Sequence, residues 1–341
     1  MAERVTIVEV AARAGVAISS VSSALNDRPG VSEQTRARIK QAASDLGFVP
    51  SVRGRSLSAK RAFTVGLVVH RDPFVLESDP FFGSFIGGLE SVLDPRGYAL
   101  ILQIGSAADE TLDRYRRLAA GRRVDGVVLN ELTVDDPRVP LVRELDLPAI
   151  AVNPAAGFPL PAVRQDDSAG IGELVEHLVA LGHRRFAHVA GPGHFIHAQH
   201  RSEAWRRALV AAGHDPGVVV DADFTYDAGA RAARQLFETG ASSDRPTAVF
   251  CANDLAAIGF MAEADRLGLR VPDDVSVAGF DGIELGSYVR PGLTTMSTAP
   301  RLIGAEAARL LLLAIDGGPV ADATIEPARL LVRASTGPAP R

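Results

Sequence analysis

Short, uninterrupted apolar segments recur through most of this chain, and stretches with helical character separate them. The apolar segments span residues 64–69, 98–104, 126–129, 149–152, 185–190, 247–251 and 275–279. A strand that is apolar on both faces has to be covered on both, which is typical of a parallel sheet with helices on either side. One sheet built from all of these strands would be long for a chain of 341 residues. The pattern therefore predicts an α/β domain of two similar lobes with parallel sheets and a cleft between them.

The first sixty residues follow a different, purely helical pattern. Thr6 and Glu9 fit a capping box. In this motif the residue that precedes the helix and the residue three positions later each accept a hydrogen bond from the other's backbone N–H. Gly15 ends this helix, a second short helix is expected over 18–26, and a third over 32–46. Two helices joined by a tight glycine turn, with a third that completes a small core, predict a small all-α helix-turn-helix domain. An ordinary small helical bundle is the alternative.

Charge divides along the chain near the same place. Residues 1–61 carry ten Lys and Arg against five Asp and Glu, a net charge of +5, whereas the whole chain has a net charge of −5. Binding of nucleic-acid phosphates requires a local excess of positive charge, and an acidic remainder limits indiscriminate adsorption. The asymmetry favours a nucleic acid as a partner, although charge by itself does not decide it.

Several other classes of protein fit the sequence poorly. Cys251 is the single cysteine, so an internal disulfide is excluded. No apolar run reaches the roughly 18 residues of a membrane span, and the N-terminus has no apolar signal core, so a cytoplasmic protein without a membrane partner is expected. His194 and His197 lack a third ligand at metal spacing, so no metal and no other cofactor is expected.

Enzymes and transport proteins fit poorly as well. The segment 191–194 follows a predicted strand but lacks the full dinucleotide-binding glycine pattern, and no phosphate-binding loop or nucleophile elbow is present. The chain is therefore not expected to be an enzyme. A free-standing binding protein for transport would carry an export signal and no basic helical unit, and the sequence shows the reverse.

Three motifs follow one another in the N-terminal region. They are VTIVEVAARAGVAISSVSSALN at 5–26, VSEQTRARIK at 31–40 and LGFVP at 46–50. In this order they resemble the lac-repressor family of transcription regulators, and the resemblance continues through almost the whole chain. In that family the second helix enters the major groove of DNA, which assigns base reading to Ile18, Ser19 and Ser23 and backbone anchoring to Thr6 and Ser22. Ser23 stands where many members carry arginine or histidine, so weaker discrimination is expected at its base pair.

Residues 51–61 form a basic linker, and composition alone indicates a mobile tether. The family resemblance implies a hinge that becomes helical on the correct DNA and inserts a leucine from each subunit into the minor groove. Leu57 matches that wedge, and Arg53 and Arg55 lie where they can reach phosphates. An apolar wedge unstacks a base step at a cost of a few kcal/mol, which additional contacts must offset.

The two-lobed domain resembles the type I periplasmic sugar-binding fold, which the family uses to bind its effector. Ligands of such sheets lie at the carboxyl ends of the strands. The resemblance assigns effector binding to Phe82, Asp166, His197, Arg201, Phe224, Asn253 and Asp281. Polar groups of this kind suit vicinal hydroxyls or an anion, and the aromatic rings suit a sugar's C–H face or a flat base. The structural alternatives are core packing for the two phenylalanines, helix capping for Asn253 and a surface position for Arg201.

The predicted boundaries are residues 1–50 for the helix-turn-helix domain, 51–61 for the hinge and 62–341 for the effector-binding and dimerisation domain. The first lobe takes about 62–163 and 298–323, and the second about 164–295 and 326–341. The resemblance implies a homodimer on a near-palindromic DNA operator, acting as a repressor controlled by a sugar or sugar derivative. An activator or a corepressor-dependent regulator, with a non-sugar effector such as a nucleobase, is the alternative, because the sequence does not fix the sign of regulation.

Overall fold

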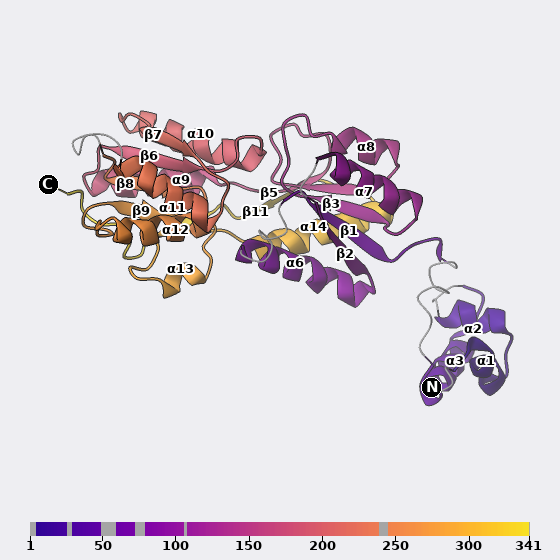
Figure 1. The fold of residues 1–341 in the computed structure, drawn as a ribbon. Coiled ribbons are helices and arrows are strands. Elements are labelled where there is room, and N and C mark those ends of the chain that lie inside the picture. Colours follow the sequence, from indigo (N-terminus) through magenta and orange to yellow (C-terminus); the bar gives the residue numbers. More distant parts are fainter. Residues whose placement is uncertain are drawn as a thin grey trace. The chain divides into compact units, whose positions relative to one another are not determined.

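The computed structural model describes residues 5–25, 29–48, 59–71, 79–105, 108–238 and 245–340 (Figure 1). The chain divides into two compact units, Met1–Phe63 and Thr64–Arg341. No single helix in these ranges is long and apolar enough to cross a membrane. The only combination that meets the length and composition criterion there is the pair Ile7–Ala14 and Ile18–Leu25, which is bent by 102°.

The first unit contains three helices: α1 (Ile7–Ala14), α2 (Ile18–Leu25) and α3 (Glu33–Asp45). The predicted capping box is present, because the Thr6 backbone N–H donates to Glu9 Oε2 at 2.6 Å. Gly15 ends α1 in the left-handed conformation, with φ of 62°, which glycine adopts without steric cost. Val10 on α1, Val21 on α2 and Ile39 on α3 are fully buried and belong to one hydrophobic core. The predicted helix-turn-helix arrangement is therefore confirmed.

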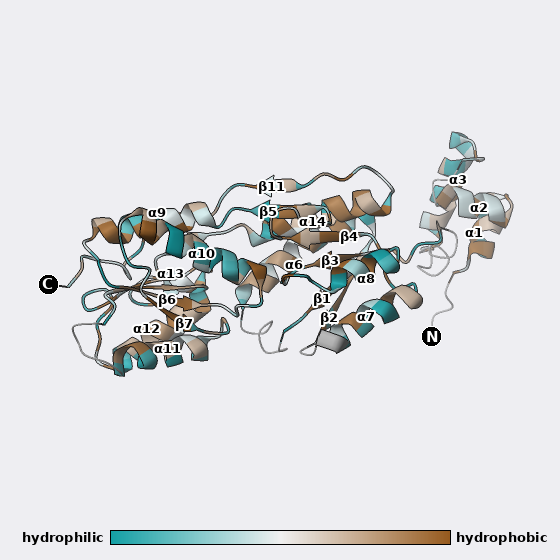
Figure 2. Ribbon diagram, turned by 90° about the horizontal axis from the view of Figure 1, so that it is seen from above, coloured by the Kyte–Doolittle hydropathy of each residue, from teal (hydrophilic) through white to brown (hydrophobic). Residues whose placement is uncertain are grey.

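The first lobe of the second unit is a six-stranded parallel sheet in the order β11-β5-β4-β3-β1-β2. Its strands are β1 (Thr64–Val69), β2 (Ala99–Ile104), β3 (Gly126–Leu129), β4 (Ala149–Val152), β5 (Ala162–Gln165) and β11 (Ala323–Ile325). Its helical segments are α6 (Pro80–Leu93), η1 (Asp94–Arg96), α7 (Ala108–Ala120), α8 (Arg138–Glu144) and α14 (Pro300–Ile315). Figure 2 shows brown, apolar strands inside this lobe and teal segments along α7.

The second lobe is a four-stranded parallel sheet in the order β7-β6-β8-β9. Its strands are β6 (Phe186–Ala190), β7 (Val218–Asp221), β8 (Ala248–Cys251) and β9 (Ser276–Ala278). Its helices are α9 (Ser168–Ala180), α10 (Ile196–Ala211), α11 (Tyr226–Glu238), α12 (Asp254–Arg266) and α13 (Leu285–Tyr288). An antiparallel pair, β10 (Thr295–Ser297) with β12 (Arg329–Leu331), lies beside it. The α/β fold with two parallel sheets predicted from the sequence is confirmed.

The chain passes between the lobes after β5, again between β10 and α14, and a third time between β11 and β12. The predicted lobe boundaries imply crossings after residue 163, at 295–298 and at 323–326. In the structure Ala162 still lies within the first lobe's sheet, because β5 pairs with both β4 and β11. The last long helix, α14, packs on α6 and on strands β3, β4 and β5 of the first lobe.

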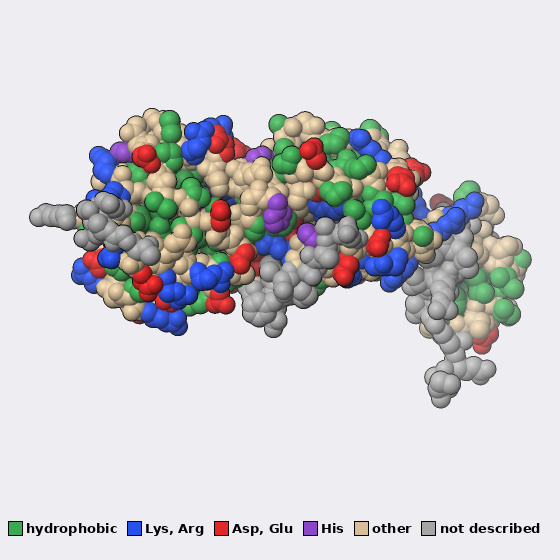
Figure 3. All heavy atoms as spheres, turned by 45° about the horizontal axis from the view of Figure 1, so that its top comes forward, with side chains coloured by type: hydrophobic (Ala, Val, Ile, Leu, Met, Phe, Trp, Pro, Cys, Tyr) green, Lys and Arg blue, Asp and Glu red, His purple; other side chains and the backbone are tan. Residues whose placement is uncertain are grey.

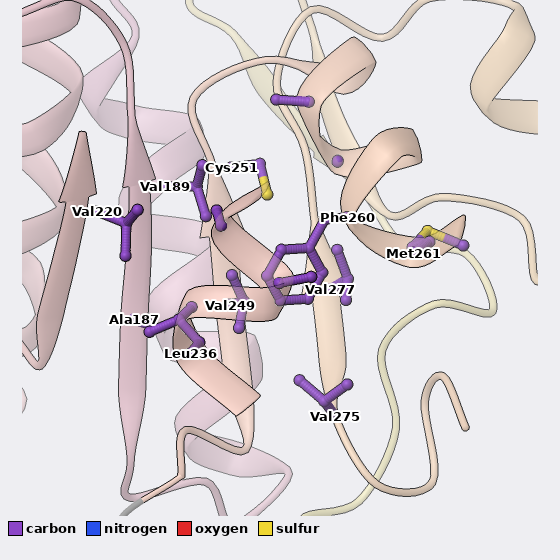
Figure 4. Close-up of a cluster of buried hydrophobic side chains, with 14 of the residues drawn as sticks. Ala187, Val189, Val220, Leu236, Val249, Cys251, Phe260, Met261, Val275 and Val277 are labelled. Carbon is purple, nitrogen blue, oxygen red and sulfur yellow. The ribbon is translucent and has the colours of Figure 1, made fainter. Parts of the chain in front are cut away.

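The second lobe has a core on each side of its sheet. Val249, Phe260 and Val277 belong to the core that α11 and α12 cover, and Figure 4 shows Cys251 among the same side chains. The thiol of Cys251 is fully buried, and burial raises its pKa. A thiol in this environment is an inert core group. On the other face, Trp205 and Phe250 pack between α9, α10 and the strands.

Candidate functional site

The predicted DNA-reading side chains cluster on the exposed side of α2. Ile18 is 48% exposed, Ser19 is exposed, and Ser22 and Ser23 are partly exposed. On α3, Arg36 Nη1 donates to the Ala24 carbonyl at 3.0 Å and so fixes the end of α2. The three serines on this face are small side chains. Arg53, Arg55 and Leu57 lie outside the described residues.

A cavity of about 80 Å³ lies between the two lobes, at the carboxyl ends of the strands. Figure 3 shows side chains of histidine, of Lys or Arg and of Asp or Glu gathered where the lobes meet. From the first lobe the cavity is lined by Arg71, Asp79, Phe81, Phe82, Asn130, Glu131, Val152 and Asn153. From the second it is lined by His197, Arg201, Phe224, Asn253 and Asp281. The resemblance to a known family thus placed Phe82 and five second-lobe residues at one site.

Asp166 is the predicted effector residue that does not line this cavity. It lines a neighbouring groove with His200 and Glu203. Its Oδ1 accepts hydrogen bonds from the backbone N–H of Ser168, at 2.9 Å, and from the Ser168 hydroxyl, at 2.6 Å. The carboxylate therefore shapes the turn that leads into α9.

Arg201 is the most heavily bonded cation of the cavity. Its Nε donates to Asp167 Oδ2 at 3.0 Å and its Nη1 donates to the Ala252 carbonyl at 2.7 Å. Its Nη2 lies 3.6 Å from Asp281 Oδ1, and its guanidinium lies 3.8 Å from the centroid of the Phe280 ring. Arg201 is 8% exposed, so the surface position considered for it is wrong. Burial raises the pKa of Asp281 well above its usual value, against the opposing charge of Arg201.

Asn253 and Phe224 are coupled to each other. The Asn253 side chain caps α12 by accepting from the backbone N–H of Ala256 at 3.0 Å, and its Nδ2 donates to the Phe224 carbonyl at 2.8 Å. Phe224 has a φ of 68°, a left-handed conformation that is costly for an aromatic residue. Asn253 therefore caps a helix, which was the structural alternative predicted for it. Its side chain also holds the strained Phe224 at the cavity.

His197 lies between two aromatic neighbours. Its ring stacks on Phe195 with centroids 5.4 Å apart and on Phe224 with centroids 5.5 Å apart. Burial, followed by the charges of Arg201 and Arg71, lowers its pKa well below the usual value. The imidazole is therefore neutral near pH 7 and can both donate and accept a hydrogen bond.

Asn130 and Glu131 were not identified from the sequence, although they directly follow the predicted strand 126–129. Asn130 is 5% exposed, and neither amide atom has a hydrogen-bond partner within the described segments. Glu131 Oε2 likewise has no hydrogen-bond partner there. Buried polar atoms normally have partners, so these atoms are the groups with which the cavity can bind a ligand. Ligands of parallel sheets lie at the carboxyl ends of the strands, and this rule, applied to the first lobe, could have found both residues.

Arg71 is a third residue that the sequence analysis did not identify. It follows β1, and its Nε lies 2.5 Å from Glu131 Oε1, with side chains that are 10% and 7% exposed. Its guanidinium lies 4.8 Å from the centroid of Phe195 and 4.9 Å from that of Phe224. The pair Arg71–Glu131 is formed by residues sixty positions apart, and no local pattern in the sequence indicates it.

Glu131 makes stability depend on pH. Burial raises its pKa from 4.5 to about 7, against the opposing charge of Arg71. Because the folded pKa exceeds the unfolded one, the folded state binds the proton more tightly. This stabilising contribution is complete below about pH 4.5 and is lost as the pH rises through about 7. In the wild-type protein we expect the free energy of unfolding to fall by on the order of 3 kcal/mol between these limits, and Glu131→Gln should abolish this fall. Urea unfolding from pH 4.5 to 8.5 measures it, and parallel curves for the two proteins would contradict the assignment.

Comparison with protein families covers both units. Residues 6–51 match the lacI family of bacterial regulatory proteins, and residues 175–336 match a periplasmic binding protein-like domain. The HTH-type transcriptional regulator CelR of Thermobifida fusca is 35% identical to this chain, over 96% of either protein. The HTH-type transcriptional repressor CytR of Escherichia coli K12 is 32% identical over 97% of this chain and 96% of its own.

Solved structures of lacI-family regulators are also similar to this chain. A CelR–cellobiose complex has a TM-score of 0.74 and 33% identity, covering 97% of this chain and 100% of its own. A lac repressor dimer bound to operator and the anti-inducer ONPF has a TM-score of 0.84 and 27% identity, covering 98% of this chain and 100% of its own. The family resemblance predicted from the N-terminal motifs is confirmed by these matches over nearly the full length. This chain belongs to the lacI family of bacterial regulatory proteins.

Proposed function

We propose that the chain is a transcriptional repressor that binds a near-palindromic operator as a homodimer and is controlled by an uncharged sugar bound between its lobes. The observation that carries the choice of ligand is that buried atoms of Asn130 and Glu131 have no hydrogen-bond partner among the described residues and line the same cavity as the ring of Phe224. A sugar offers hydroxyls to the polar atoms of Asn130 and Glu131 and a C–H face to the ring of Phe224. The CelR–cellobiose complex supports this class. We also propose that the protein has no catalytic activity, because the relatives compared with it are regulators.

The charges of the cavity favour an uncharged ligand over an anion. Arg201 is already paired with Asp167 and Asp281, and Arg71 is paired with Glu131. An anionic ligand would have to displace these carboxylates or lie beside them, since Asp79 also lines the cavity. Like charges at short distance in a buried site are strongly unfavourable. The two arginines therefore serve to neutralise the protein's own acids.

Ligand titration tests this proposal. We expect cellobiose, or another neutral sugar among glucose and ribose, to raise the melting temperature and to give a saturable calorimetric isotherm. Gluconate and glucose 6-phosphate serve as anionic controls and should give no shift. Tighter binding of an anion than of every neutral sugar would overturn the proposed ligand class. Operator fragments selected from random duplex then show, by fluorescence anisotropy, whether the sugar weakens DNA binding.

DNA binding depends, in this proposal, on the face of α2 and on the hinge. Ile18, Ser19 and Ser23 read bases, Thr6 and Ser22 anchor the backbone, and Arg53 and Arg55 contact phosphates. Ligand binding changes the angle between the lobes, which alters the spacing of the two hinges and so their ability to form on DNA.

Leu57→Ala is expected to weaken operator binding by roughly tenfold to a hundredfold, because the apolar wedge that stabilises the kinked duplex is lost. Anisotropy titrations with the selected operator measure the change. Leu57→Met keeps an apolar side chain of similar size and is the control, with a small expected effect. If Leu57→Ala bound the operator as tightly as wild type, Leu57 would not be the wedge.

A further inference from the structure

The side chain of Arg71 reaches from one lobe to the other. Arg71 follows β1 in the first lobe, whereas Phe195 precedes α10 and Phe224 follows β7 in the second lobe. Its guanidinium lies over both rings, 4.8 and 4.9 Å from their centroids. A cation over aromatic faces is attracted most strongly where both are desolvated, and here Phe195 is 2% and Phe224 6% exposed. This contact therefore holds the lobes together.

The first lobe fixes the position of Arg71 through Glu131. Glu131 has a left-handed backbone, with φ of 49°, and its carbonyl accepts from Arg138 Nη2 at 3.0 Å. Arg138 is itself paired with Asp136 at 2.6 Å, and Arg138 and Asp136 are both buried. The loop that carries Glu131 is thus rigid, and Glu131 in turn orients the guanidinium toward the second lobe.

A backbone seam joins the lobes next to this contact. The Ile196 N–H donates to the Leu132 carbonyl at 2.8 Å, and Thr133 forms an isolated antiparallel bridge with Phe195. Leu132 and Thr133 come directly after Glu131, and Ile196 directly follows Phe195. The Arg71 contact and the seam therefore join the same two segments, and a change in one changes the other.

The part of the cleft that these buried groups line is narrow in this state. Its volume is about 80 Å³, whereas ligand pockets are typically 300–1,000 Å³. Arg71 lines the cavity and lies over the ring of Phe224, the face on which a sugar would stack. We propose that Arg71 is a latch that holds the cleft shut, and that the effector binds by displacing its guanidinium from Phe195 and Phe224. The proposal rests on the proposed function, because it describes how that same site is opened.

Hydrogen exchange tests the latch without any ligand, in the full-length protein. In Arg71→Ala we expect the Ile196 amide to exchange at least tenfold faster than in wild type, because the seam opens more often. Arg71→Ala/Glu131→Gln should show the same acceleration, since it leaves no unpaired carboxylate at position 131. Arg116→Ala is the control, because Arg116 lies on the first lobe's surface with 54% of its side chain exposed. Unchanged exchange in the double variant would overturn the proposal.

Calorimetry with cellobiose, or with the neutral sugar that first gives an isotherm, tests displacement. We expect Arg71→Ala to bind about tenfold more tightly than wild type, because the ligand no longer competes with the guanidinium. Weaker or equal binding would show that Arg71 contacts the ligand or contributes nothing, and either result overturns the displacement. If no sugar binds either protein, the proposed ligand class is wrong, and the exchange experiment still decides the latch.

Discussion

Gly304→Ala is expected to destabilise the effector-binding unit by about 3 kcal/mol or more, because a methyl group at this position has no room. An added Cβ at Gly304, on α14, would lie 2.2 Å from the carbonyl oxygen of Phe85 on α6. The contact is reciprocal, since a Cβ at Gly88 on α6 would lie 2.0 Å from the carbonyl oxygen of Arg301 on α14. Both obstacles are backbone atoms, so no side chain can move aside.

The consequence would extend beyond these two helices. α14 packs on strands β3 and β4, and α6 carries Phe82 at the cavity. Separating the helices would therefore move Phe82 relative to the strand ends that carry Asn130 and Glu131. We expect sugar affinity to fall together with stability in this variant.

Gly83→Ala is the matched control. Gly83 lies on α6 as Gly88 does, but a Cβ there would have no other atom of the described residues within 4 Å. Replacing a helical glycine by alanine at an open position stabilises a protein by up to about 1 kcal/mol. Urea unfolding at one pH measures both variants, with an unchanged dependence on denaturant as the sign of an intact fold. Equal effects of the two substitutions would contradict the packing argument.

These glycines show where prediction from the sequence ends. The apolar runs, the capping box at Thr6 and the glycine after α1 are local features, and the structure confirms the fold class that they predicted. In contrast, Gly83 and Gly88 cannot be told apart by their neighbours in sequence. What distinguishes them is the backbone of α14, more than two hundred residues away, which approaches one and not the other.

Some residues of the site could likewise be predicted from the sequence, and others could not. The family resemblance assigned Asp281 and Asn253 to the site, and both residues follow predicted strands, whose ends share one edge of a parallel sheet. Arg71 was missed because its importance comes from contacts with Glu131, Phe195 and Phe224, which only the folded chain brings together. Asp166 also follows a strand, yet it lines a neighbouring groove, and its carboxylate accepts two hydrogen bonds from Ser168.

Arg201→Met is expected to destabilise the unit by about 3–5 kcal/mol, because it leaves two buried carboxylates without their cation. Arg201 is the partner of both Asp167 and Asp281, whose side chains are 12% and 8% exposed. The methionine keeps most of the volume and the contact with Phe280, so loss of packing is a minor part of the effect.

The dependence of this loss on pH identifies its cause. The pKa of Asp281 is already raised in the folded wild-type protein, and removing the cation raises it further. Protonation then favours the folded state, so the deficit of Arg201→Met should be smaller at pH 5 than at pH 8. Adding Asp281→Asn should recover part of the loss at pH 8. Arg206→Met, on the exposed side of α10 with 53% of the arginine side chain accessible, should change stability by less than about 0.5 kcal/mol. A deficit that is equal at both pH values would mean that Arg201 stabilises the lobe by packing, and that the charges at the cavity do not depend on it.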